Sequence, residues 1–195
     1  GLSNAVAISG GFYHSLVLLE DGSVVGWGRN NYGQIDIPDG LSNVVSVSAG
    51  YHHSLALLED GTVVGWGYNT YGQSDSPDGL LNVITINAGA YHSLALLEDG
   101  SVVCWGRNTE GQIDIPDELS NVIAVYAGYY HSLALLEDGT VVGWGYNNYG
   151  QSDSPDGLSN AVAISGGFYH SLVLLEDGSV VGWGRNNYGQ IDIPD

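Results

Sequence analysis

The hydrophobic and polar positions of this chain repeat with a period of 39 residues. Tryptophan marks the period at Trp27, Trp66, Trp105, Trp144 and Trp183. We divide the sequence into five consecutive units within a single array over residues 1–195, with bounds at 1–39, 40–78, 79–117, 118–156 and 157–195. The first and last units are identical, residue for residue. A fixed period of this length is typical of repeat architectures, in which neighbouring units share one continuous core.

Each unit predicts four short β-strands. In the first unit the apolar runs are "NAVAIS", "HSLVLLE", "SVVGWG" and "GQIDIP", which are too short for helices and rich in β-forming residues. The Asp-Gly pair in "EDGS" predicts a hairpin in which both central residues adopt positive φ. Pro38 ends the fourth run because proline has no N–H to donate to a sheet.

The second and third runs are apolar at consecutive positions, as in residues 16–19 and Val24-Val25. Such runs indicate strands that are covered on both faces of the sheet. A four-stranded antiparallel meander, covered on both faces and repeated around an axis, is a propeller blade. The predicted fold class is therefore all-β: a β-propeller of four-stranded antiparallel blades, with five 39-residue units in this chain. A stacked β-solenoid is the alternative, although solenoid coils are shorter and have fewer Asp-Gly hairpins.

Charge restricts the partners. The chain has 22 acidic residues against three basic ones, a net charge of −19. Nucleic acid and anionic membranes would be repelled, so we expect neither as a partner. No apolar run is long enough to cross a bilayer. The single Cys104 leaves the cellular compartment open.

No catalytic or cofactor motif stands out. Serine, histidine and aspartate recur in every unit, whereas a catalytic triad needs one special convergence. Phosphate loops, paired-cysteine zinc spacing and EF-hand spacing are not found. The sequence therefore predicts no enzyme activity, no cofactor and no metal. One histidine per unit could still form a metal-binding ring, but we interpret each as a structural tether for the preceding turn; they are His14, His53, His92, His131 and His170.

Successive antiparallel strands send alternate turns to opposite ends of a sheet. The turns "GFYH" and "RNNYG" should share one end, and "LLEDGS" and "PDGLSN" the other. The first end carries aromatic residues and all three arginines, which is the composition of protein-binding hot spots. Most carboxylates fall at the other end. We define the aromatic face by the candidate binding residues Phe12, Tyr13, Arg29, Tyr51, His52, Tyr91, Arg107, Tyr129, Tyr130, Phe168, Tyr169 and Arg185.

The segment "AGYHHSLALLEDGTVVGWGYNTYGQ" at residues 49–73 resembles the repeat of the regulator of chromosome condensation family. All five units fit the pattern, so the resemblance covers the whole chain. The short unit is similar to that of the propeller-type β-lactamase inhibitory proteins, which implies a propeller, usually of seven blades. It also implies protein binding through the first turn. Nucleotide exchange on a small GTPase with chromatin binding, the role of the family's namesake, conflicts with the negative charge.

Two hypotheses of function follow. The first is a non-enzymatic module that binds a protein partner of unknown identity through the aromatic face. The alternative is an engineered or amplified structural repeat protein that self-associates and has no other partner. The alternative rests on the identical first and last units and on the lack of methionine.

Overall fold

The computed structural model describes residues 1–194, which form strands joined by turns, with no helix in that range. No helix suited to crossing a membrane is found among these residues. The first strands of the units are β1 (Ala5–Gly10), β4 (Val44–Ala49), β7 (Val83–Ala88), β10 (Val122–Ala127) and β13 (Ala161–Gly166). The second strands are β2 (His14–Leu19), β5 (His53–Leu58), β8 (His92–Leu97), β11 (His131–Leu136) and β14 (His170–Leu175). The third strands are β3 (Val24–Gly28), β6 (Val63–Gly67), β9 (Val102–Gly106), β12 (Val141–Gly145) and β15 (Val180–Gly184).

Each unit forms one antiparallel sheet of three strands in sequence order, so the prediction of four-stranded blades is wrong. The expected fourth strand, "GQIDIP", is a series of turns. Asn30 Oδ1 accepts the N–H of Ile35 at 3.1 Å, and the Gly33 carbonyl accepts that of Asp36 at 3.0 Å. Because these donors are satisfied locally, they are not available to a β-ladder.

The Asp-Gly hairpin forms, but not with the predicted turn. Gly22 has a φ of +78°, whereas Asp21 is not among the residues with positive φ. The Leu19 carbonyl accepts the Gly22 N–H at 3.0 Å, and the Asp21 carboxylate accepts the Ser23 N–H at 3.0 Å. This is a type I turn followed by one left-handed glycine, which fits a loop one residue longer than the two-residue turn.

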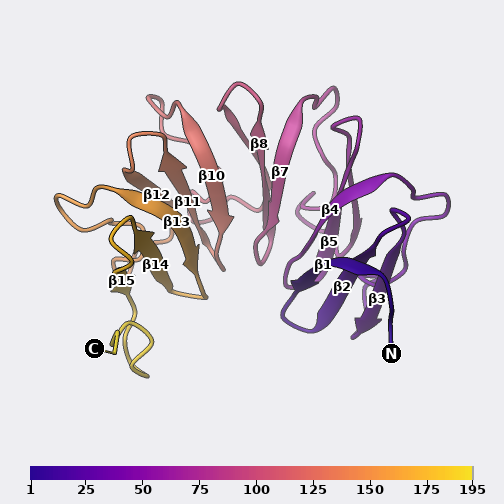
Figure 1. The fold of residues 1–195 in the computed structure, drawn as a ribbon, viewed down its shortest axis with the longest axis horizontal. Helices are drawn as coiled ribbons and strands as arrows, with labels where there is room; N and C mark the ends of the chain where they lie inside the picture. Colours follow the sequence, from indigo (N-terminus) through magenta and orange to yellow (C-terminus); the bar gives the residue numbers. More distant parts are fainter. Residues whose placement is uncertain (195) are drawn as a thin grey trace.

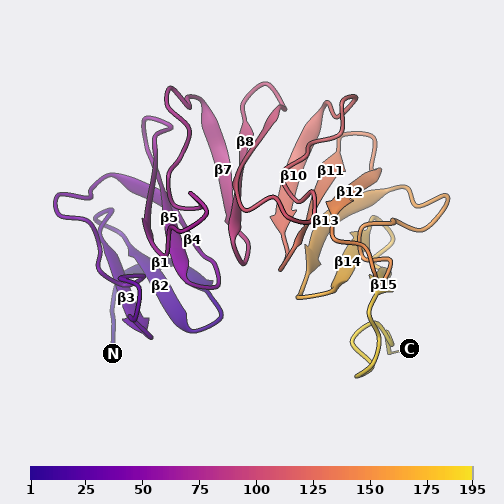
Figure 2. The ribbon, with the colours of Figure 1, turned by 180° about the vertical axis from the view of Figure 1, so that it is seen from behind.

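The five sheets follow one another around an open arch, with the two chain ends at its opposite sides (Figures 1 and 2). The first strands contact each other in order, β1 with β4, β4 with β7, β7 with β10 and β10 with β13. The second strand lies between the other two in every sheet. A sheet in the middle of the arch is therefore covered by a neighbour on each face.

One glutamine carbonyl holds each pair of neighbouring sheets together. The Gln34 carbonyl accepts a hydrogen bond from the Trp66 indole at 2.9 Å and another from the Ser54 hydroxyl at 2.8 Å. The same pair of bonds recurs at the next three interfaces, where the acceptors are the carbonyls of Gln73, Gln112 and Gln151.

Four of the five tryptophans lie in the core between neighbouring sheets. Trp66, Trp105, Trp144 and Trp183 are only 6–7% exposed, whereas Trp27 is 49% exposed. Around Trp66 the core joins Leu16, Leu18 and Val24 of the first unit to Val44, Val47 and Ala56 of the second. Trp27 differs because no other described sheet covers that face of the first unit.

Four of the five repeat histidines also join neighbouring sheets, and their hydrogen bonds do not go to the preceding turn as predicted. His53 Nε2 lies 3.0 Å from Ser93 Oγ in the next unit. The other three pairs are His14 with Ser54, His92 with Ser132 and His131 with Ser171. Residues 1–194 contain no group of three or more histidine, cysteine, aspartate or glutamate side chains that could hold a metal ion.

Burial keeps these rings neutral. It lowers the pKa of His53 and of His92 from 6.5 to about 3, with help from neighbouring histidines. It lowers the pKa of His131 to about 4. A charged imidazole would lose its hydration at these interfaces, and the neutral form is therefore strongly preferred.

We predict that one substitution has very different effects in two units. Trp144→Ala removes a buried indole and leaves a cavity, so it should lower the free energy of unfolding by about 3–5 kcal/mol. Trp27→Ala removes a half-exposed ring and should cost much less. Urea denaturation of both variants measures the difference, and equal losses would contradict the interface described above.

We also predict that acid destabilises the fold through its histidines. Below about pH 6.5 the unfolded chain binds protons on these rings, whereas the folded chain does not until its much lower pKa values of about 3 to 4 are reached. The contribution of these neutral rings to the free energy of unfolding is therefore fully present above about pH 6.5. It is lost as the pH falls from there towards the folded-state pKa values. Between about pH 7.5 and about pH 5.5 the loss should be about 1 kcal/mol for each of the three.

The measurement is the free energy of unfolding in urea across this pH range. His92→Gln is the matched variant, because it removes one titrating ring from an interface. Its pH-dependent loss should be smaller than that of the unmodified chain by about 1 kcal/mol, the contribution of one ring. An unchanged pH dependence would show that the histidines do not cause it.

Candidate functional site: the aromatic face

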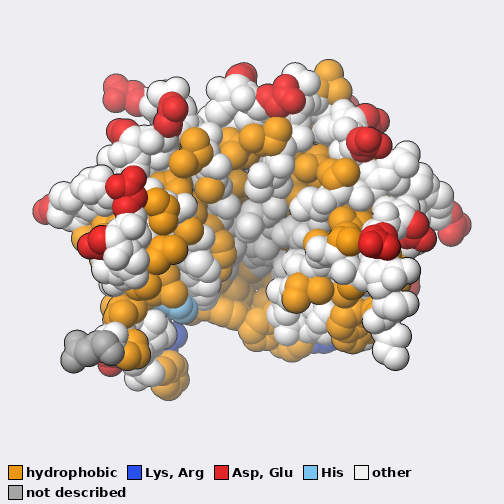
Figure 3. Space-filling view, in the orientation of Figure 1, with side chains coloured by type: hydrophobic (Ala, Val, Ile, Leu, Met, Phe, Trp, Pro, Cys, Tyr) orange, Lys and Arg blue, Asp and Glu red, His pale blue; other side chains and the backbone are white. Residues whose placement is uncertain are grey.

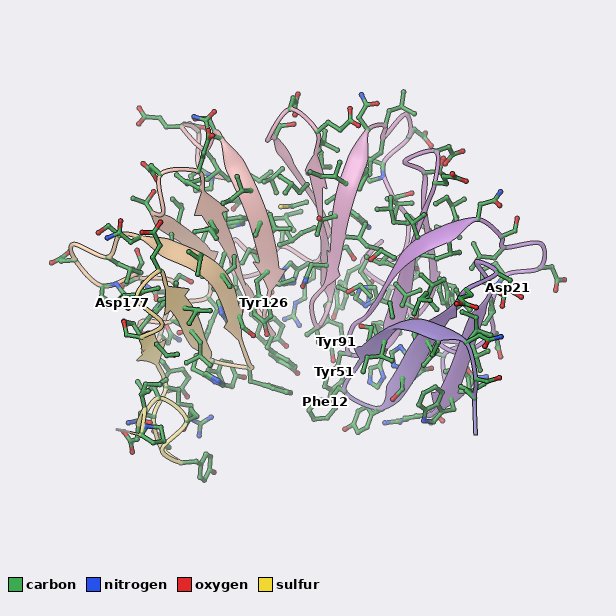
Figure 4. All side chains as sticks on the ribbon, viewed as in Figure 1. Phe12, Asp21, Tyr51, Tyr91, Tyr126 and Asp177 are labelled. Carbon is green, nitrogen blue, oxygen red and sulfur yellow. The ribbon has the colours of Figure 1, made fainter. Side chains whose placement is uncertain are left out.

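The loops between the first and second strands meet near the centre of the arch. Their first positions are Phe12, Tyr51, Ala90, Tyr129 and Phe168. Ring centroids lie 4.6 Å apart for Phe12 and Tyr51, 4.3 Å for Tyr129 and Phe168, and 5.0 Å for Phe12 and Phe168. The first and last units thus touch here. Figure 4 shows Phe12 and Tyr51 side by side at the open side of the arch.

Alanine at position 90 shapes this cluster. Ala90 is 4% exposed and carries no ring. The ring centroids of Tyr51 and Tyr129, from the two flanking units, lie 5.6 Å apart. The small residue therefore lets the two neighbouring rings pack together. The four rings of the cluster therefore form one continuous surface.

Glycine brings the loops close enough for these contacts. The Phe12 N–H donates to the Gly50 carbonyl at 3.2 Å, and the Tyr51 N–H donates to the Gly89 carbonyl at 3.3 Å. A Cβ added to Gly50 would lie 2.6 Å from His53 Cε1 and closer still to the Gly89 carbonyl oxygen. Any larger residue would push the loops apart.

The second positions of the same loops carry further aromatic side chains. They are Tyr13, His52, Tyr91, Tyr130 and Tyr169. Tyr13 stacks on His52 with centroids 5.3 Å apart, and Tyr91 stacks on Tyr130 at 6.1 Å. His52 is only 7% exposed, and burial and the Arg29 charge lower its pKa. A hydrogen bond with Tyr13 is the main cause that raises the pKa of Tyr51 to about 12.

The three arginines lie over tyrosine rings. The guanidinium carbon is 4.9 Å from the Tyr13 centroid for Arg29, 4.7 Å from that of Tyr130 for Arg107, and 5.3 Å from that of Tyr149 for Arg185. Cation–π contacts of this kind hold the long side chains in place.

The arginine N–H groups are only partly used. Arg107 donates to the Tyr130 hydroxyl at 3.0 Å and to the Thr109 hydroxyl at 2.8 Å, both neutral acceptors. Arg185 Nε is buried without a hydrogen-bond partner among residues 1–194. A buried donor of this type costs free energy until an acceptor reaches it.

All twelve residues of the aromatic face thus lie at one end of the sheets, in loops that contact one another. The candidate binding residues chosen from the sequence do not include Tyr71 and Tyr149, whose rings lie under Arg107 and Arg185. Their position in the "RNNYG" type of turn, at the same end as "GFYH", was the available signal. The candidate residues also do not include Tyr126, an aromatic residue inside a first strand, where other units have serine or asparagine.

Tyr126 lines a hollow beside the aromatic cluster. The hollow has a volume of about 230 Å³ and is bounded by small residues at the ends of the first strands and by Phe12, Tyr51, Tyr129 and Phe168. Burial raises the pKa of Tyr126 to about 12, so its hydroxyl stays protonated. The hollow is large enough to take one apolar side chain.

Most of the carboxylates gather at the opposite end, on the outer edge of the arch (Figure 3). Figure 4 places Asp21 and Asp177 there, far from Phe12. Hydrogen bonds from Ser23 and Ser179 lower the pKa of these two carboxyls. Asp195, expected in the same group, lies outside the described residues.

The repeat units of this chain match a known family. The family model for the regulator of chromosome condensation (RCC1) repeat matches every unit, at residues 5–34, 44–73, 83–112, 122–151 and 161–190. Protein pim1 of Schizosaccharomyces pombe is 53% identical over 36 residues, which is 18% of this chain and 7% of pim1.

Solved structures share the fold. Prp20p from Saccharomyces cerevisiae superposes with a TM-score of 0.81 and 23% identity, over 98% of this chain and 59% of that one. The ectodomain of the Physcomitrella patens receptor kinase CR4 gives 0.82 and 24%, over 97% and 54%. The chain therefore spans little more than half the length of these proteins. With repeats matched in all five units and this shared propeller fold, the chain belongs to the regulator of chromosome condensation (RCC1) repeat family.

Proposed function

We propose that the chain is a non-enzymatic protein-binding module and that the aromatic face is its binding site. The observation that carries the proposal is the continuous surface of packed rings, with three arginines held over tyrosines. Tyrosine and arginine dominate the energetically important residues of protein interfaces. Rings that are already packed lose little conformational freedom when a partner binds.

The polar groups of the face suggest what the partner presents. Arg185 Nε lacks a hydrogen-bond acceptor among residues 1–194, and the two hydrogen bonds of Arg107 go to neutral hydroxyl oxygens. A partner with an apolar surface and a few carboxylate or carbonyl groups would fit both features. Its wider surface should be positive, because a net charge of −19 attracts cationic proteins at long range.

Relatives of the same fold support protein binding. Prp20p from Saccharomyces cerevisiae binds Gsp1p and histones, and the same protein has been crystallised with Kap60. This chain is 23–24% identical to those structures, so their partners are not carried over. What we extend to this chain is the class of function, recognition of another protein.

The test begins with partner identification. The immobilised chain is exposed to a lysate of its source, retained proteins are identified by mass spectrometry, and the main one is purified. Its affinity is then measured by calorimetry for the unmodified chain and for a variant with alanine at Tyr13, Tyr91, Tyr130 and Tyr169. Losing four hot-spot rings should weaken binding by at least about a hundredfold.

The matched control changes the other end. Glu20→Gln, Glu59→Gln and Glu98→Gln alter three exposed carboxylates of the acidic hairpins and should leave short-range affinity nearly unchanged at physiological salt. Circular dichroism and thermal melting establish that both variants fold. If the control loses binding and the tyrosine variant keeps it, the partner binds the acidic end and the proposal is wrong.

A further inference from the structure

The first and last units have the same sequence but different exposure. Trp27 is 49% exposed, whereas its counterpart Trp183 is 6% exposed. Leu174 is 40% exposed, whereas its counterpart Leu18 is 3% exposed. Since the residues are identical, the difference comes from the neighbouring sheet alone. The first unit has one uncovered face and the last unit has the opposite one.

These two surfaces are the halves of one interface. We define the head face by Ala5, Ile8 and Trp27, the counterparts of residues that pack against the preceding sheet in later units. Ile8 is 81% exposed, and Ala5 is exposed although its counterpart Ala161 is 5% exposed. We define the tail face by Leu174, Val180 and Gln190, the counterparts of Leu18, Val24 and Gln34.

The polar groups of the two faces are complementary as well. Within the arch each tryptophan indole donates to a glutamine carbonyl of the preceding unit at 2.9–3.0 Å. Trp27 has such a donor, and Gln190 has the matching carbonyl. Likewise His170 corresponds to histidines that reach a serine in the next unit, and Ser15 corresponds to those serines. Within residues 1–194 these groups lack the partners that their counterparts have.

From these observations we propose that a second copy of this chain docks head to tail, with the head face of one copy on the tail face of the other. The head of the last unit already packs on the fourth unit, and the tail of the first unit already packs on the second. Both surfaces are therefore competent to form this interface, with the same side chains. The bonds expected across it run from the Trp27 indole to the Gln190 carbonyl and from His170 to the Ser15 hydroxyl.

A single copy does not satisfy its own ends. Its first and last sheets lie on opposite sides of the arch opening (Figures 1 and 2). These two sheets touch through side chains of the aromatic face, such as Phe12 and Phe168. The apolar strand faces remain exposed, and open faces of repeat arrays are association surfaces.

The contact is heterologous, because the two surfaces that meet are different. Each docked copy still offers one free head and one free tail. Assembly can therefore continue beyond a dimer, unless a ring closes. Each copy also carries a net charge of −19, so the copies repel one another at low ionic strength. Added salt screens this repulsion and should favour association.

The test is solution mass by light scattering across a concentration series, in low and high salt. The unmodified chain should exceed its 20.5-kDa monomer mass as concentration rises, and more so in high salt. Trp27→Glu spoils the head and Leu174→Glu spoils the tail. Each variant alone should remain monomeric.

Mixing the two variants gives the sharpest result. The intact tail of W27E can accept the intact head of L174E, but no further copy can add. The mixture should therefore stop at twice the 20.5-kDa chain mass. Ile84→Glu is the control, since Ile84 is 50% exposed in β7 of the middle unit and should not affect assembly. Circular dichroism verifies that every variant folds.

A chain that remains a monomer at the highest concentration reached, in both salts, would overturn the proposal. So would association that persists in W27E and L174E alone, because that would require a different surface. The aromatic face is not changed in any of these variants. Loss of assembly and loss of partner binding therefore remain separate outcomes.

Discussion

A single backbone carbonyl, that of the glutamine that recurs in every unit, organises the contact between neighbouring sheets. It accepts both the indole of the next unit and a serine hydroxyl, at 2.8–3.0 Å in all four interfaces. The turn that presents it is fixed by side chains of its own unit, for example the bond from the Tyr32 N–H to Gln34 Oε1. A three-stranded sheet with two apolar faces has little stability alone, so each unit depends on its neighbours.

The same interface places the functional candidates. When two sheets pack, their first loops come within hydrogen-bonding distance, as the bond from the Phe12 N–H to the Gly50 carbonyl shows. Rings carried by those loops then have to meet. The aromatic face is thus a consequence of sheet packing, while the choice of tyrosine, arginine or alanine at each loop position is free to serve recognition. The uncovered head and tail faces arise from the same interface where it is left unpaired.

Much of this structure could be predicted from the sequence because the signals are local and repeated. The 39-residue period, the first three strands of each unit and the strand alternation that separates aromatic from acidic turns all follow from residue patterns. The fourth strand was predicted wrongly because "GQIDIP" alternates like a strand. In the structure the side-chain oxygens of Asn30 and Gln34 accept backbone N–H groups of this segment and of the turn before it, which fixes a series of turns. The histidine partners could not be found in this way. His14 bonds Ser54 in the following unit, and this pairing depends on how sheets pack.

The central claim is that neighbouring sheets, and not single units, bury the tryptophans. Hydrogen exchange of the five indole N–H groups, followed by NMR in dilute solution, tests it most directly. We expect slow exchange for Trp66, Trp105, Trp144 and Trp183, whose indoles donate to glutamine carbonyls, and fast exchange for the exposed Trp27. Similar exchange rates for all five indoles in the monomer would contradict the account.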